Sequence, residues 1–218
     1  TRPFTGPVPP ELTGLATTHG AVHLRLQPLS QEEVLELVQH RLGVADLPPP
    51  VSRFIRERAH GSPFFSEELA YALRESGLII IEDGVCHVPP HVNLAEISFP
   101  DTLQGVITSR IDRLTAQQQL ALKVAAVIGT SLPMRLLEEI HPVPDDRVHL
   151  PAHMDTFDRA QLLRLAEVRP ELQYAFMNVI TREVAYDLLL FAQRRHLHQQ
   201  CAQWYETIHE ADLSVAYP

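Results

Sequence analysis

A series of short amphipathic segments with helix start and stop signals at their ends most constrains the fold of this chain. Ser30 and Glu33 form a capping box before an apolar stripe that ends at Gly43, and Thr115 and Gln118 form a second one before a strongly apolar segment. A capping box satisfies two of the backbone N–H groups that a helix leaves open in its first turn. The sequence therefore predicts a mainly α-helical protein.

The remaining helices are predicted from apolar residues that recur at helical spacing. Pro100 and Asp101 are expected to cap one of them, and Asp155 is expected to cap a helix that runs through Leu165. The last helix has a predicted break near Phe191. The predicted segments are 51–60, 64–76, 102–114, 134–140, 155–165 and 179–210.

Other segments favour β-structure. The dipeptide Asp83-Gly84 between two β-branched runs is a strong signal for a hairpin. Residues 21–26 alternate as an edge strand does, and two short strands are expected near 168 and at 172–176, around a turn. A hairpin that follows three helices has the order of a winged helix-turn-helix.

Composition restricts the class of partner. A formal net charge of −9 argues against nonspecific attraction to nucleic acid or anionic lipid. No run of about 18 apolar residues occurs, so no membrane-spanning helix is expected. Cys86 and Cys201 lie far apart without metal-ligand spacing, which favours reduced thiols in a cytoplasmic protein, and the histidines also lack such a spacing. Because the chain begins with Thr1 rather than Met, we expect it to be a piece of a longer protein.

Two parts of the first hundred or so residues resemble the STAND ATPases, the signal-transduction branch of the AAA+ class. Residues 61–69, which contain Gly61 and Pro63, resemble the Gly-x-Pro segment of their helical lid. Residues 100–104 and 110–114 resemble the start of the winged-helix domain that follows the lid in that family.

The resemblance continues through the second half of the chain. Residues 125–129 resemble the second helix of the winged-helix domain, and residues 174–176 with 181–186 resemble its closing signature. Residues 193–198 then begin what in the family is usually a tetratricopeptide-like array. The best match is the ATPase region attached to class III adenylate cyclases of the soluble type and to related bacterial signalling regulators.

The resemblance implies a mainly α fold with a helical lid, then a winged helix-turn-helix domain with a small β-hairpin, and then a helical array. A loop rich in Pro and Asn near 89–99 separates the two halves. The implied parts are the tail end of a P-loop core at 1–28, a lid at 29–90, a winged-helix domain at 100–190 and the start of the repeat region at 191–218.

The family binds ATP between the P-loop core and the lid, so the resemblance implies ATP or ADP with Mg²⁺ as the cofactor of the parent protein. The motif Gly-x-x-x-x-Gly-Lys-Ser/Thr does not occur in the 218 residues. Without it there is no backbone nest for the phosphates and no Mg²⁺ ligand set. We therefore assign no catalytic residue and no metal ligand here, and expect ATPase activity of the parent protein rather than of this piece alone.

Four residues are candidate nucleotide contacts by resemblance. Arg2 lies where the family places a sensor arginine, whose guanidinium can bond the γ-phosphate; an exposed terminal arginine is the alternative. Pro63 would pack its ring on adenine while Gly61 lets the backbone come close; a plain turn between helices is the alternative. Asn178 stands where relatives carry a histidine that reads phosphates, and an amide donates a hydrogen bond without carrying charge. The resemblance therefore implies either an uncharged phosphate contact at Asn178 or a switch whose response is altered or lost.

Adjacent acids such as Glu67 and Glu68 are interpreted as solvated helix faces, because neighbouring side chains on a helix diverge by about 100°. A recognition helix at 134–140 would carry two acids and one base, so direct DNA binding is not favoured.

The function expected from these residues is a nucleotide-dependent signalling switch. It would couple the P-loop core of the same chain to an output domain, such as an adenylate cyclase, and to the repeat array and other proteins. The alternatives are part of a transcription-regulator ATPase and an interaction scaffold that no longer binds nucleotide.

Overall fold

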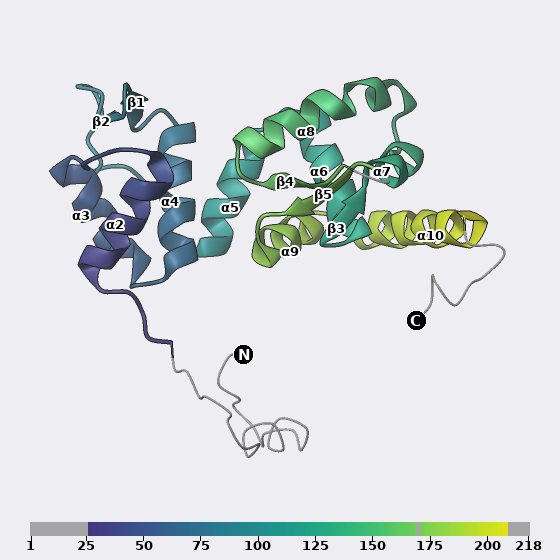
Figure 1. The fold of residues 1–218 in the computed structure, drawn as a ribbon, viewed down its shortest axis with the longest axis horizontal. Coiled ribbons are helices and arrows are strands. Elements are labelled where there is room, and N and C mark those ends of the chain that lie inside the picture. Colours follow the sequence, from purple (N-terminus) through teal and green to yellow (C-terminus); the bar gives the residue numbers. More distant parts are fainter. Residues whose placement is uncertain (1–25, 169–170, 209–218) are drawn as a thin grey trace, which may run out of the picture.

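The computed structural model describes residues 26–168 and 171–208, which form a mainly helical molecule with two small antiparallel sheets. Figure 1 shows two lobes with α5 (Leu103–Asp112) between them, and α10 (Phe191–Ile208) lies along the second lobe. Arg2 lies outside the described residues, as does the expected strand at 21–26 apart from Leu26.

Within residues 26–87, the first lobe contains three helices and a hairpin. Its elements are α2 (Gln31–Leu42), α3 (Pro49–Ala59), α4 (Pro63–Glu75), β1 (Ile80–Glu82) and β2 (Val85–His87). Ser30 and Glu33 form the predicted capping box of α2, and Gly43 ends that helix with φ 69°. The hairpin is also confirmed: Ile81 pairs with Cys86, and Asp83 and Gly84 both have positive φ, as this tight turn requires.

The second lobe combines helices with three short strands in the part of the chain that the structure describes. Its elements are α6 (Ala116–Ile128), β3 (Ser131–Pro133), α7 (Met134–Ile140), a 3₁₀ helix (Pro144–His149), α8 (Leu150–Arg159), β4 (Leu163–Glu167), β5 (Gln173–Phe176), α9 (Val179–Asp187) and α10. The capping box of Thr115 and Gln118 opens α6 as predicted. The break predicted near Phe191 falls between α9 and α10.

The three strands of the second lobe form one antiparallel sheet in the order β3-β5-β4. Tyr174 of the central strand pairs with Leu132 on one side and with Leu165 on the other. Two apolar cores lie on either side of α5, one within each lobe, and α5 packs against α4 of the first lobe and α9 of the second.

Two predictions for the second lobe are wrong. The helix expected from Asp155 to Leu165 is the end of α8 followed by β4, because α8 begins at Leu150 with Pro151 in its first turn and Asp155 lies in its middle. The chain turns at Gln161, which has φ 54°. The strand expected near 168 is therefore β4 at Leu163–Glu167.

Smaller differences concern element starts. The cap of α5 is Thr102, whose side chain accepts a hydrogen bond from Gly105 N, rather than Pro100-Asp101. Residues 131–133, which lie just before the predicted helix at 134–140, form β3 through pairing with Gln173–Ala175. The first boundary is therefore set by a local side-chain cap, and the second by pairing with a strand that is distant in sequence.

Candidate functional site at the seam between the lobes

The turn that leads into α4 is fixed by a close contact with the segment before α2. Gly61 accepts a hydrogen bond from Leu29 N at 2.9 Å and has φ 72°. A Cβ atom at this position would lie 2.6 Å from Leu29 O, so a larger residue would push the two segments apart. Gly61 is therefore required by the packing of its own chain.

Pro63 is the first residue of α4, after the N-cap Ser62, whose side chain accepts a hydrogen bond from Phe65 N. Proline suits this position because its fixed φ fits a helix and its missing N–H would have no partner there. Its ring is exposed.

Pro63 lines a depression of about 270 Å³ at the seam between the lobes, which we call the Pro63 pocket. Asn178, at the start of α9 in the second lobe, lines the same pocket. Two of the four predicted site residues thus come together, although 115 positions separate them in sequence (178 − 63). The full lining is Arg41, Pro63, Phe64, Glu67, Glu68, Tyr71, Gln161, Met177 and Asn178.

Asn178 has a structural role that its sequence position did not indicate. It is the N-cap of α9, and its Oδ1 accepts a hydrogen bond from Ile180 N at 2.8 Å. Asparagine is among the best N-cap residues. The amide NH₂ group takes no part in this cap and offers a ligand a donor without charge.

A buried arginine at the floor of the seam connects the lobes. The side chain of Arg110 on α5 is 0% exposed, and it bonds Glu68 at 2.5 Å and Glu75 at 2.7 Å, both on α4. A second bond to Glu75, from Arg110 Nε, makes that pair bidentate. Arg110 also donates to the carbonyl of Ala160, in the turn after α8. One guanidinium therefore holds three elements together.

The seam perturbs the charges within it. Burial raises the pKa of Glu68, and the attraction of Arg110 only partly opposes this effect. Burial acts against the charge of Arg110, but its bonds and attraction to Glu75 and Glu68 raise its pKa above the usual value. Burial also raises the pKa of Tyr71, whose ring centroid lies 5.2 Å from Arg110 Cζ.

Glu68 and Arg110 are the residues that sequence reasoning missed. The interpretation of Glu68 as part of a solvated pair is wrong, because its side chain is 3% exposed and only its neighbour Glu67 faces outward, toward Arg41. A signal was present: Glu68 and Glu75 are seven residues apart, so they lie on the same face of a helix. Nothing local indicated that the arginine which meets them would come from α5.

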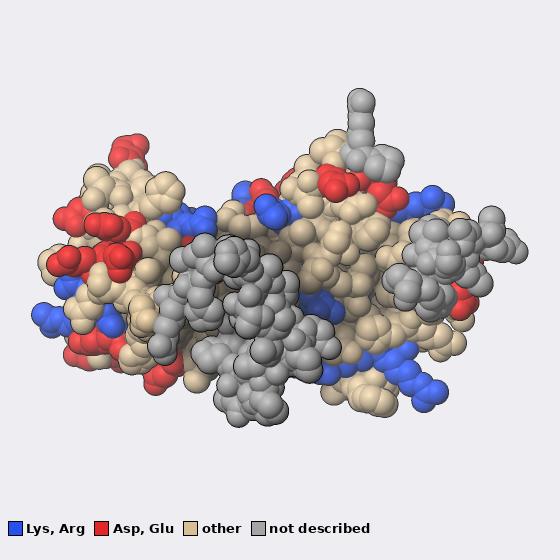
Figure 2. All heavy atoms as spheres, turned by 60° about the horizontal axis from the view of Figure 1, so that its bottom comes forward, with Lys and Arg blue, Asp and Glu red and all other residues tan. Residues whose placement is uncertain are grey.

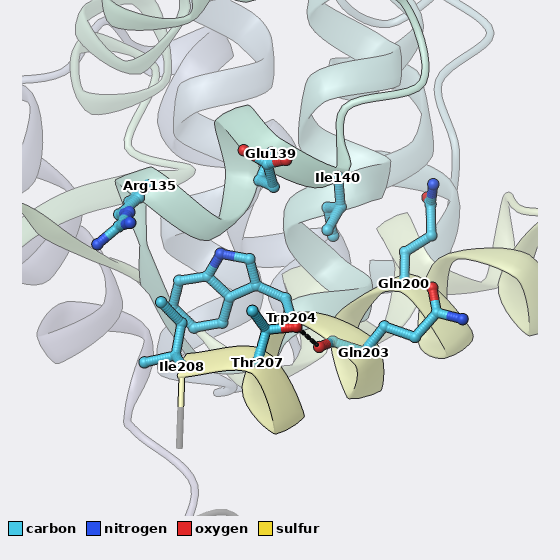
Figure 3. A pocket seen from close by; sticks show the side chains of 8 residues that line it. All are labelled: Arg135, Glu139, Ile140, Gln200, Gln203, Trp204, Thr207 and Ile208. Atoms are coloured by element: carbon cyan, nitrogen blue, oxygen red, sulfur yellow. Dashed lines mark hydrogen bonds between the residues drawn. The ribbon is translucent and has the colours of Figure 1, made fainter. Parts of the chain in front are cut away.

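A larger depression lies between α7 and α10, and no predicted site residue lines it. Its volume is about 410 Å³. Figure 3 shows Trp204 and Ile208 of α10 pointing toward the side chains of α7, with Gln200 and Gln203 along the rim. Among residues 26–168 and 171–208, no group of three or more His, Cys, Asp or Glu side chains could hold a metal ion, and no helix is long and apolar enough to cross a membrane.

Comparison with known proteins gives matches to the first lobe and to most of the chain. The sequence model of a family described as a domain of unknown function (DUF8739) matches residues 30–87, which cover the first lobe. An uncharacterized protein of Rhizobium meliloti (strain 1021) is 25% identical over 183 residues, 81% of this chain and 16% of that protein.

Two further relatives are mammalian enzymes. Adenylate cyclase type 10 of Rattus norvegicus is 21% identical over 212 residues, 80% of this chain and 13% of the relative. The enzyme of the same name from Mus musculus is 21% identical over 201 residues, 75% of this chain and 12% of the relative. The chain thus spans less than a fifth of the length of each of these relatives.

Proposed function

We propose that this chain is the lid and winged-helix part of an ATP/ADP-dependent signalling switch of the STAND type, which couples nucleotide state to an attached output such as an adenylate cyclase. The observation that carries the proposal is that Pro63 of the first lobe and Asn178 of the second line one pocket. A ligand in this pocket contacts both lobes and so favours one arrangement of them over another.

The lining of the Pro63 pocket fits a purine base. Pro63 and Phe64 offer apolar surface on which a flat ring can pack, and the amides of Gln161 and Asn178 can bond the edge of the base. Glu67 and Glu68 at the same pocket would repel phosphate, so the phosphates of ATP would extend away from these acids. ATP carries one phosphate more than ADP, and this difference would separate the two states of the switch.

The Arg110 network gives the pocket a route to the rest of the molecule. Glu68 lines the pocket and bonds Arg110, and Arg110 bonds the turn that carries Gln161 at Ala160. Direct bonds thus lead from Glu68 through Arg110 to Ala160. A ligand that shifts Glu68 therefore alters the contact between the lobes.

The element order of the second lobe supports a winged-helix assignment. The order α6-β3-α7-α8-β4-β5, with a β3-β5-β4 sheet, agrees with the order expected of a winged helix in which α8 would be the third helix. The recognition-helix position would then fall on α8 rather than on 134–140. Helix α8 carries Asp155 and Asp158 beside a single arginine, Arg159. Its surface therefore also disfavours contact with the phosphate backbone of DNA.

The relatives agree with a signalling role. Two of them are named adenylate cyclase type 10, and this chain corresponds to a small part of each. The cyclase reaction itself, the P-loop core and the Mg²⁺ ligands are proposed to belong to other parts of the parent protein.

The test is nucleotide binding by the parent protein with Pro63→Ala. We expect this variant to weaken ATP and ADP binding about tenfold, the loss of roughly 1.4 kcal/mol of ring contact. Pro49→Ala is the matched control, because Pro49 is also an exposed first-turn proline, on α3 and outside the pocket. Equal affinities for the two variants would remove the base-binding role of Pro63.

A specific observation favours one alternative, an interaction scaffold that no longer binds nucleotide. Leu190 and Phe191, at the start of α10, are 70% and 81% exposed. Two adjacent, strongly exposed apolar side chains can form part of a contact surface for another protein. Absence of nucleotide binding by the parent protein, with intact folding, would favour this function.

A further inference from the structure

A second depression, which we call the arginine groove, lies beside the Pro63 pocket. It has a volume of about 250 Å³ and shares Arg41, Tyr71 and Gln161 with that pocket. Its charged lining is entirely basic and comes from α2, α4 and α8. The full lining is His40, Arg41, Tyr71, Arg74, Arg159 and Gln161.

The three arginines are held in place by their own contacts. Arg41 bonds Glu67 at 2.7 Å, and the guanidinium carbon of Arg74 lies 5.3 Å from the ring centroid of Tyr71. Arg159 donates to Asp155 O at 3.2 Å and to the hydroxyl of Thr156 at 3.3 Å. A guanidinium has five N–H donors, so each of these contacts leaves donors for a ligand. Side chains that are already ordered lose less entropy when they bind.

The groove is unusual in an acidic chain. The net charge is −9, and Figure 2 shows acidic atoms gathered over the first lobe, with Lys and Arg atoms on both sides of the notch between the lobes. Glu67, the acid paired with Arg41, lines the Pro63 pocket and is not among the residues that line the groove. An anion in the groove would therefore meet positive charge from both lobes.

We propose that the arginine groove binds a phosphate group and that the bound anion ties the two lobes together. Arginine forks match the oxygens of phosphate in geometry and charge, and the Tyr71 hydroxyl and Gln161 amide supply further donors. Arg41 and Arg74 would bind it from the first lobe and Arg159 from the second. The source of the phosphate is free inorganic phosphate or the phosphates of a nucleotide, and the inference holds whether or not Pro63 packs on a base.

The test is a calorimetric titration of the 218-residue chain with inorganic phosphate at fixed ionic strength. We expect saturable binding and a rise in Tm, because a ligand bound only to the folded state stabilises it. Arg159→Gln and Arg74→Gln should each weaken binding about tenfold, the effect of one lost charge-assisted bond. Arg159 is exposed, so its replacement should leave the circular dichroism spectrum unchanged.

Arg164→Gln is the matched control, since Arg164 is an exposed arginine of the same lobe on β4 and outside the groove. An equal loss of affinity in this variant, or no saturable heat with phosphate in the wild type, would overturn the proposal. Parallel titrations with ATP, ADP and adenosine identify the source. If ATP and ADP bind more tightly than phosphate, and Arg159→Gln loses this binding, the groove takes the phosphates of a nucleotide. If ATP, ADP and phosphate bind equally, the groove takes the free anion.

The two proposals can fail separately. Pro63→Ala should leave the affinity for inorganic phosphate unchanged, because Pro63 does not line the groove. Both proposals are supported if Arg159→Gln loses phosphate binding and Pro63→Ala still binds nucleotide more weakly than Pro49→Ala does. Phosphate binding that depends on Pro63 but not on Arg159 would contradict the groove as the site.

Discussion

The core of the second lobe and the seam between the lobes are both buried, but they are built from opposite chemistry. Leu136 and Phe157 of the core are 0% exposed and meet other apolar side chains. At the seam Arg110 is equally buried and meets two carboxylates. An apolar core gains free energy in proportion to the area that it buries, whereas a buried ion pair is favourable only when its geometry and hydrogen bonds are good. The seam is therefore the place where a small chemical change can alter how the lobes sit.

The largest expected effect comes from removing the charge that the seam is built around. Arg110→Met keeps most of the side-chain volume but leaves Glu68 and Glu75 without their partner, and we expect a loss of about 3–5 kcal/mol in the free energy of unfolding. Urea denaturation followed by circular dichroism measures this loss. Leu136→Ala in the core should cost about 2–5 kcal/mol through a cavity.

The two variants should differ in whether a second substitution restores part of their stability. Adding Glu68→Gln to Arg110→Met should recover part of the lost stability, because one unpaired buried charge disappears, whereas adding it to Leu136→Ala should not. Additive effects in the first pair would mean that Arg110 stabilises the seam by packing alone.

A smaller effect is expected when only the acid is changed. Burial raises the pKa of Glu68 despite its bond to Arg110, so its ionised form gains no net stabilisation in the folded protein relative to water. Glu75 also keeps its bidentate bond with Arg110. We therefore expect Glu68→Gln to cost no more than about 1 kcal/mol at pH 7, measured by the same urea titration. A loss as large as that of Arg110→Met would show that the seam needs both acids ionised.

The first lobe was predictable because its signals are local. The capping box at Ser30, the positive-φ Gly43 and the Asp83-Gly84 turn each act within a few residues, and all three stand in the structure as expected. In such a segment the chain specifies its own helix ends through hydrogen bonds to neighbours in sequence.

The second lobe was less predictable because its sheet is not local. Residues 131–133 become a strand only because Gln173–Ala175 lies beside them. Leu165 belongs to β4 although its distance of three residues from Leu162 also suits one face of a helix. A short apolar run cannot be assigned by periodicity alone.

The candidate site also has parts that local sequence signals predict and parts that depend on long-range packing. The position of Pro63 at the start of α4 follows from its own turn, and the resemblance pointed to Asn178. Their meeting in one pocket, and the meeting of Glu68 with Arg110, depend on how α4, α5 and α9 pack. Arg2 lies outside the described residues, so its sensor role stays a prediction.

The smallest effect is expected from a polar corner inside the otherwise apolar second lobe. His153 on α8 is 8% exposed, and its Nε2 and that of His141 have no hydrogen-bond partner among the described residues. Burial lowers the pKa of His153, with a further contribution from His149, whose ring centroid is 6.4 Å away. Asp146, which accepts a hydrogen bond from Gln117 of α6, acts in the opposite direction.

The unfolded chain therefore takes up a proton at His153 before the folded protein does. Stability should be complete above the ordinary pKa of 6.5 and should fall as pH drops from there toward the lowered folded value. Tm measured between pH 8 and pH 5 should decline less in His153→Leu than in the wild type, while His196→Gln, at an exposed histidine of α10, should keep the wild-type slope. If His153→Leu also kept that slope, the pH dependence would come from elsewhere, and the corner would behave as part of the apolar core rather than as a second buried polar region.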